Sequence, residues 1–248
     1  MADIASWVLL FIAGCASWMI GTLSGATGSI TLVAILTYII RVTTIAPAVT
    51  IASLMASPAR VIVWWRNVDW RVVRWYMPGA VTGAVLGSWM FSWASIRGLD
   101  IIVGLFLLSA PIQYRFGQSA RSFPMKVQWF VPVSLAVGTI SGLAGASSMI
   151  SMPFYLNYGL IRERMIATGA VHSLFIQIAK LVTYGSLGVL STGSIVEGVC
   201  AGSGAVFAIV VSRHWLERFK EIWFRRMAII IMAAAGISLL WRARNIFG

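Results

Sequence analysis

The feature that most constrains this chain is a series of apolar stretches, separated by short breaks that contain basic residues or glycine. A membrane-spanning helix needs about 20 mostly apolar residues. Hydropathy predicts such segments at about residues 4–20, 26–40, 45–65, 72–93, 99–114, 129–157, 166–189, 193–212 and 223–241. Only 10% of the residues are charged, whereas soluble domains have about a quarter. The sequence therefore predicts an all-α polytopic membrane protein, with residues 1–248 forming one membrane domain.

The amino terminus and the basic charge fit a membrane domain. The first apolar segment begins with Asp3 rather than a basic region, and it lacks an A-x-A-like cleavage site, so we expect a first span and not a removed signal. The net charge is +12, but the basic residues gather at the ends of apolar segments, where anionic lipid headgroups lie. This placement argues against a nucleic-acid partner. Cys15 and Cys200 lie inside apolar segments, where we expect them to pack rather than to pair.

Two glycine-rich segments of the chain resemble each other. Residues 21–39 and 138–156 align without a gap, and six identical pairs result: Gly21/Gly138, Thr22/Thr139, Ser24/Ser141, Gly25/Gly142, Gly28/Gly145 and Tyr38/Tyr155. Internal repeats of this kind recur in secondary transporters. We therefore predict a first repeat over about residues 4–114, a linker over about 115–128 and a second repeat over about 129–242. Broken or re-entrant helices are expected near residues 21–28 and 138–145.

The distribution of Lys and Arg suggests how the repeats are oriented, because short cytoplasmic loops are enriched in these residues. If both glycine-rich segments were continuous crossings, the loop charges would divide almost evenly between the two sides. If each segment instead enters and leaves, one side keeps only Arg41, Arg97, Arg242 and Arg244. The other side then receives Arg66, Arg71, Arg74, Arg115, Arg121, Lys126, Arg162, Arg164, Arg213, Arg218, Lys220, Arg225 and Arg226. This asymmetry favours an odd number of elements in each half, and hence inverted repeats with a cytoplasmic linker and both termini outside. In total we expect about eight spans, with the broken or re-entrant helices among them.

The glycine-rich breaks are candidate anion sites. Irregular backbone at membrane depth is tolerated only where protein or a wet cavity surrounds it. Helix N-termini at such a break present free N–H groups, and glycine lets an anion approach the backbone. The candidate residues are Gly25, Gly28 and Ser29 in the first repeat and Gly142, Gly145, Ser147 and Ser148 in the second. The alternative is that the small residues only allow close helix packing, which is the role we expect for Gly79, Gly83 and Gly87.

Two basic residues, Arg60 and Lys180, lie inside apolar segments at equivalent positions of the two repeats. A cation within the membrane is costly unless it is hydrated, paired or facing a cavity, so a transported anion is a suitable partner. Snorkelling toward lipid headgroups is the alternative. His172 and Gln177 precede Lys180 on the same segment. His172 could carry a proton or donate to an anion, or it could be a hydrogen-bonded structural residue.

Two glycine-rich breaks, each followed by an apolar run and a serine-containing helix, resemble the TauE/SafE sulfite exporter family over nearly the whole chain. The resemblance rests on Gly21, Gly25, Gly28, Gly138, Gly142, Gly145 and Pro153. It implies a secondary transporter of the cell (inner) membrane that exports sulfite, sulfoacetate or a related organosulfonate. The sequence departs from the family pattern at 29–31 and 146–148, where glycines are usual, and at Leu36, which stands opposite Pro153.

Other functions fit the residues less well. A membrane enzyme would need converging carboxylates, a metal-binding set or a nucleophile with its base, and the sequence shows none of these patterns. No cofactor is expected. A channel-like anion path, or a transporter of thiosulfate or sulfate, stays open as an alternative. The expected partners are a small anion, lipid and, through His172, protons; oligomeric state is not indicated.

Overall fold

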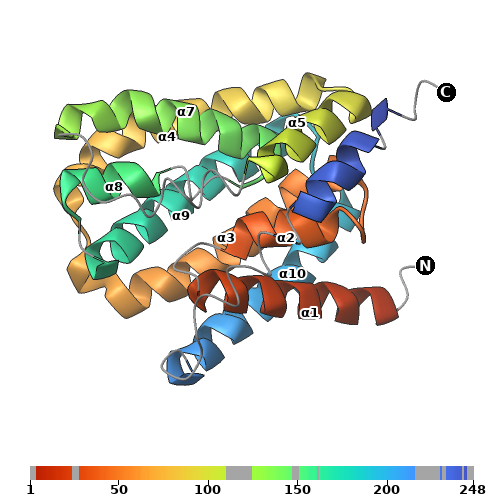
Figure 1. Cartoon of the computed structure of the whole chain (residues 1–248), viewed down its shortest axis with the longest axis horizontal. Helices are drawn as coiled ribbons and strands as arrows, with labels where there is room; N and C mark the ends of the chain where they lie inside the picture. Colours follow the sequence, from red (N-terminus) through yellow and green to blue (C-terminus); the bar gives the residue numbers. More distant parts are fainter. Residues whose placement is uncertain are drawn as a thin grey trace.

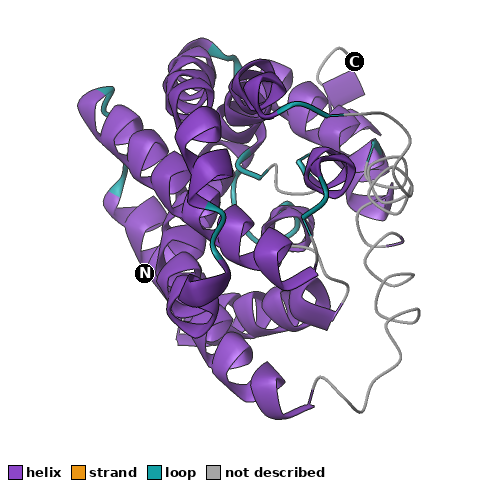
Figure 2. Ribbon diagram, turned by 90° about the vertical axis from the view of Figure 1, so that its left-hand side faces the viewer, coloured by secondary structure: helices purple, strands orange, loops and turns teal. Residues whose placement is uncertain are grey.

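The computed structural model describes residues 4–23, 28–109, 125–146, 151–160, 162–215, 230, 233–241 and 243–244. Every regular element within these residues is a helix, which confirms the predicted all-α class (Figure 2). The elements in chain order are α1 (Ile4–Leu23), α2 (Gly28–Leu36), α3 (Val42–Trp64), η1 (Trp65–Asn67), α4 (Trp70–Trp93), α5 (Ile96–Leu108), η2 (Val127–Trp129), α7 (Phe130–Ala144), α8 (Met152–Tyr158), α9 (Arg162–Ser186) and α10 (Thr192–Trp215). Residues 233–241 are also helical.

Four segments in the described part of the chain are long and apolar enough to cross a membrane. They are Ile4–Gly21, Val42–Ile62, Val127–Ala144 and Thr192–Val211. The helices α4 and α9 have 24 and 25 residues but more polar sequences. Both pack against several other helices, and polar residues of membrane helices normally face such neighbours. A membrane protein is therefore confirmed, while the count of eight spans stays a prediction.

The helices α2 and α8 are too short to cross a bilayer. They contain 9 and 7 residues, which correspond to about 14 and 11 Å, whereas the hydrocarbon core is about 30 Å thick. Within the described residues, the predicted segment at 26–40 is helical over Gly28–Leu36 and then turns at 37–40 through short-range hydrogen bonds such as Ile39 N–H to Leu36 O, 3.0 Å. Each long first helix of a repeat is followed by a short one.

The second break lies later than the sequence predicts. We expected it at 138–145, but α7 is continuous to Ala144; the described residues Gly145 and Ala146 that follow it are not helical, and α8 begins at Met152. Gly138 and Gly142 are helical and lie against the α4 backbone, Gly138 beside Ala80 and Gly142 beside Gly87. At these two positions the lack of a side chain allows α4 and α7 to pack closely, and it does not unwind α7. In the first repeat, α1 includes Gly21 and ends at Leu23, and residues 24–27 lie outside the described part.

The long helices pack in a reciprocal pattern (Figure 1). The first helix of each repeat packs on the fourth helix of the other, so that α1 contacts α10 and α7 contacts α4. The third helices also contact the fourth helices of the opposite repeat, α3 with α10 and α9 with α4. Between them, α3 and α9 contact each other. The two predicted repeats are thus interlocked rather than separate domains.

The direction of the central helices follows from their contacts. Gly198 lies beside Ala48 and Gly202 beside Ala52, so α10 runs parallel to α3. Asp69 N–H donates to Thr168 Oγ1 at 3.0 Å, whereas the Tyr76 ring, later in α4, stacks on His172, later in α9; α4 and α9 are therefore parallel. The chain reverses between α3 and α4, as the colour change at the left of Figure 1 shows. Consequently α3 and α9 are antiparallel.

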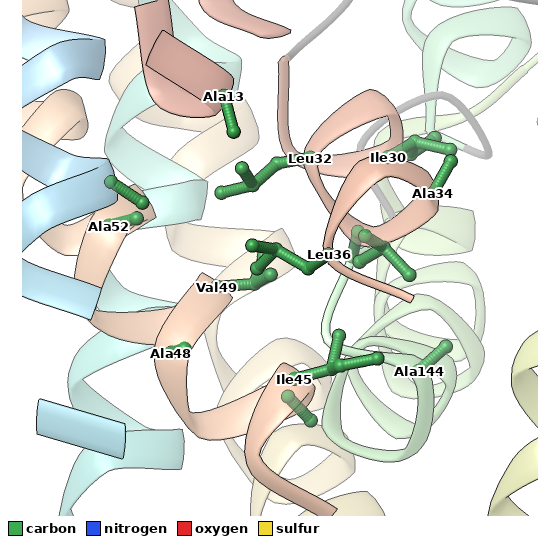
Figure 3. Close-up of a cluster of buried hydrophobic side chains, with 14 of the residues drawn as sticks. Ala13, Ile30, Leu32, Ala34, Leu36, Ile45, Ala48, Val49, Ala52 and Ala144 are labelled. Atoms are coloured by element: carbon green, nitrogen blue, oxygen red, sulfur yellow. The ribbon is translucent and has the colours of Figure 1, made fainter. Parts of the chain in front are cut away.

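Glycines make the α4 to α7 contact close. Gly79, Gly83 and Gly87 lie against the backbone of α7, near Val131, Leu135 and Thr139 respectively. The expectation that these three glycines serve packing is confirmed. A separate apolar core forms where the short helix α2 inserts Leu32 and Leu36 toward α3 and α1 (Figure 3).

Candidate functional site

Gly145, the residue that follows α7, fixes the end of this helix. Gly145 ends the helix with a φ of 85°, a left-handed conformation that glycine adopts without the strain a side chain would add. Its N–H donates to Ser141 O at 2.9 Å. The remaining carbonyl groups at this helix end need other donors, because the last carbonyl groups of an α-helix have no partner within the helix.

Two residues of α9 supply those donors. The Lys180 ammonium donates to Gly145 O at 3.0 Å and to Ser141 Oγ at 3.4 Å. The Tyr184 hydroxyl donates to Gly142 O at 2.5 Å. A cation also suits this position electrostatically, because a helix C-terminus carries a partial negative charge. The α9 helix therefore caps α7, and Lys180 has a structural role alongside any binding role.

The charge of Lys180 is not neutralised by these contacts. The side chain is 0% exposed, and both of its partners in the described part of the chain are uncharged oxygen atoms. Taking an ammonium out of water without a counter-charge costs several kcal/mol, and its hydrogen bonds at most offset this cost. Such a group is normally kept because it binds something, and an anion is the ligand that its charge favours.

A second polar cluster lies two turns earlier on α9. The His172 ring stacks on Tyr76 of α4, with ring centroids 3.9 Å apart and planes 4° from parallel. Its Nδ1 is 2.5 Å from the hydroxyl of Tyr155 in α8, and the hydroxyl of Tyr76 is 2.8 Å from Ser151 Oγ. His172 Nε2 is buried and has no hydrogen-bond partner among the described residues. One cluster thus includes Gly145, which follows α7, and the other includes Ser151, which precedes α8.

The predicted basic residue of the first repeat is less enclosed. Arg60 is half-buried in α3, and its Nε is buried without a partner within the described residues. Near it, Ser57 Oγ donates to Ser173 Oγ of α9 at 3.2 Å. Gln177 is 5% exposed and its Oε1 likewise lacks a partner in this part of the chain. Unsatisfied polar atoms therefore accompany the α3–α9 contact.

The structure brings only some predicted site residues together. Gly142, Gly145 and Lys180 meet at the end of α7, and His172 lies about two turns earlier on α9. Gly28 instead lies against the α1 backbone near Ser17, a packing role, and Ser29 is buried in α2. The remaining predicted residues, Gly25, Ser147 and Ser148, lie outside the described residues.

Four residues of the site were not predicted: Tyr76, Ser151, Tyr155 and Tyr184. Tyr155 appeared in the repeat alignment opposite Tyr38, but the two differ, since Tyr38 is 58% exposed and Tyr155 only 4%. A tyrosine in an apolar helix resembles an ordinary core residue, so its hydroxyl contact could not be foreseen. Among the described residues, no group of three or more His, Cys, Asp or Glu side chains could hold a metal ion.

Comparison with known proteins gives one match. The family model for the sulfite exporter TauE/SafE matches residues 9–239, a range that contains both glycine-rich segments, Arg60, His172 and Lys180. No curated protein and no solved structure matches the chain. The match confirms the resemblance inferred from the sequence, and it agrees with a transporter rather than an enzyme. This chain belongs to the sulfite exporter TauE/SafE family of membrane transporters, whose substrates are sulfur-containing anions.

Proposed function

We propose that this protein is a multi-pass secondary transporter of the cell (inner) membrane that exports sulfite, sulfoacetate or a related organosulfonate. The observation that carries the proposal is the wholly buried ammonium of Lys180, whose partners in the described part of the chain are neutral. Sulfite and sulfonates present several oxygen atoms that share negative charge, so they can accept hydrogen bonds from an ammonium and from neighbouring hydroxyl groups.

The transport path of this proposal runs between two inverted repeats. Equivalent helices of opposite direction are what an axis in the membrane plane produces. The antiparallel α3 and α9, and the reciprocal contacts of α1 with α10 and α7 with α4, support this arrangement. The thirteen basic residues expected on one side support a cytoplasmic linker with both termini outside.

The two basic residues of this path lie at different depths. The Ser57–Ser173 hydrogen bond sets the register of α3 against α9. Arg60 lies one turn after Ser57 in α3, and Lys180 lies two turns after Ser173 in α9. Because the two helices are antiparallel, Arg60 and Lys180 lie on opposite sides of the Ser57–Ser173 contact. At about 1.5 Å per residue, their Cα atoms are about 15 Å apart along the helices. We infer that a small anion contacts them one after the other and crosses the midplane near the Ser57–Ser173 contact.

Uptake into liposomes tests the proposal. The purified protein is reconstituted, and flux of labelled sulfite, sulfoacetate, thiosulfate and taurine is measured for the wild type, Arg60→Ala and Lys180→Ala. We expect saturable flux of at least one sulfur anion and weaker affinity in both variants. Absence of anion flux in the wild type would refute the transport proposal. Normal kinetics in both variants would refute the two-cation path but leave the family assignment intact.

Labelling of single introduced cysteines tests the topology separately. In a background without Cys15 and Cys200, a membrane-impermeant reagent should label cysteines at positions 2 and 246 from outside and at position 120 only from the cytoplasmic side. Termini on opposite sides would exclude inverted repeats with an odd number of elements.

A further inference from the structure

Two contacts fix the His172 ring, and one of the two contacting residues is itself held in place. The parallel Tyr76 ring at 3.9 Å sets the plane of the imidazole. The Tyr155 hydroxyl, 2.5 Å from Nδ1, sets the rotation of the ring within that plane. Tyr76 is itself held by Ser151, at 2.8 Å between the two oxygen atoms. Ser151 and Tyr155 come from the start and the middle of the α8 segment, so this short helix holds both aromatic partners in place.

The fixed ring leaves one nitrogen without a partner. His172 is 2% exposed, and Nε2 has no hydrogen-bond partner among the described residues. Beyond the hydroxyl groups of Tyr76, Tyr155 and Ser151, the surroundings are apolar, because the two tyrosine rings belong to a buried cluster with Phe130, Met165 and Ile176. An unpaired polar atom in such a place costs about 1–3 kcal/mol. That cost is recovered when a ligand supplies the missing partner.

The direction of the Tyr155 hydrogen bond decides what Nε2 can bind. A neutral imidazole has one N–H donor and one acceptor, and the bond made by one nitrogen sets the state of the other. The phenol O–H is a stronger acid than a neutral imidazole N–H, and an imidazole nitrogen is a stronger base than a phenol oxygen. The favoured pairing is therefore donation from Tyr155 to Nδ1, which leaves the hydrogen on Nε2.

We propose that Tyr155 is a positioning residue that holds His172 as the Nε2–H tautomer, so that His172 donates a hydrogen bond to an oxygen atom of the transported anion. The assignment rests on the proposed transport function. It gives the path a neutral donor in addition to its cations, about 12 Å along α9 from Lys180 at 1.5 Å per residue. No change in the protonation of His172 is needed for this role.

Nitrogen-15 NMR tests the tautomer directly, because the chain has only His172 and His214. In histidine-labelled His214→Gln protein, we expect a pyridine-type resonance for Nδ1 and a pyrrole-type resonance for Nε2. Addition of sulfite should shift the Nε2 resonance. A pyrrole-type Nδ1, or an Nε2 resonance unmoved by saturating sulfite, would overturn the inference. Because this readout does not measure transport, it distinguishes failure of the tautomer from failure of the transport proposal.

Variants separate positioning by Tyr155 from a merely structural role. Glutamine at position 172 places an amide donor near the Nε2 position, whereas asparagine places it near Nδ1. We expect His172→Asn to raise the KM for sulfite about tenfold to a hundredfold and Tyr155→Phe to raise it about fivefold. His172→Gln should raise the KM less than His172→Asn does, and adding Tyr155→Phe to His172→Gln should change the KM no further. An equal effect of Tyr155→Phe in both backgrounds would show that Tyr155 does not act through the tautomer.

Discussion

Replacing Lys180 with methionine separates the capping role of this residue from its binding role. Methionine has nearly the same length and shape as the lysine side chain but no charge and no donor. The variant loses the hydrogen bonds to Gly145 O and Ser141 Oγ. Each such charge-assisted bond contributes about 1.5–3 kcal/mol to stability.

The stability lost with these hydrogen bonds is offset, because the variant no longer buries a charged ammonium. The ammonium is 0% exposed, and keeping such a cation out of water costs several kcal/mol. The two contributions nearly cancel, so we expect the free energy of unfolding of Lys180→Met to differ from that of the wild type by less than about 2 kcal/mol. Binding of an anion by Lys180 has no such offset, because the variant loses the charge that attracts the anion and gains nothing in return. Its dissociation constant should rise about tenfold to a hundredfold, the equivalent of one lost charge-assisted bond.

Thermal unfolding in detergent and equilibrium binding of labelled sulfite measure the two effects. Tyr184→Phe is the matched control, because it removes a cap from the same helix end without changing the charge. That variant should lose about 1–2 kcal/mol of stability and keep its sulfite affinity within about twofold. If Lys180→Met were strongly destabilised while sulfite affinity stayed normal, Lys180 would be only a cap, and the binding argument would fail.

Two further predictions concern the backbone. Gly145→Ala should lose about 1–2 kcal/mol of stability, seen as a lower Tm, because φ is 85° there and the new methyl group would lie 3.1 Å from Ala46 Cα. Gly83→Ile should reduce the yield of monodisperse protein in size-exclusion chromatography, because a side chain at this position meets the α7 backbone at Leu135. The neighbouring substitution Thr82→Ile, on an exposed face of α4, should leave the yield unchanged; equal losses in both variants would contradict the packing account.

Features with a simple physical cost could be predicted from the sequence. Lipid excludes unpaired backbone groups, so long apolar segments had to be helical, and the helices agree with most predicted segments. Lys180 stood out because a charge in an apolar run is expensive. Lys180 is buried where it donates to Gly145 O at the end of α7. Gly145 lies far from Lys180 in the sequence, so this contact could not be inferred from the local pattern.

Glycine was the residue whose role the sequence predicted least well. Gly138, Gly142 and Gly145 lie within eight residues, and each could either break a helix or admit a neighbouring one. Only the position of α4 decides between these roles, because α4 covers Gly138 and Gly142 and leaves Gly145 to end the helix. The roles of Tyr155 and Tyr184 depend likewise on which atoms α8 and α7 present to α9.

Sulfite counterflow tests the central claim most directly. Liposomes containing the purified protein are loaded with unlabelled sulfite and diluted into a trace of labelled sulfite, and liposomes without a load serve as the control. A carrier with a sulfur-anion site should accumulate label transiently in the loaded liposomes, and Lys180→Met should abolish this overshoot at the same sulfite concentration. Label that enters loaded and empty liposomes equally, or does not enter at all, would contradict the account.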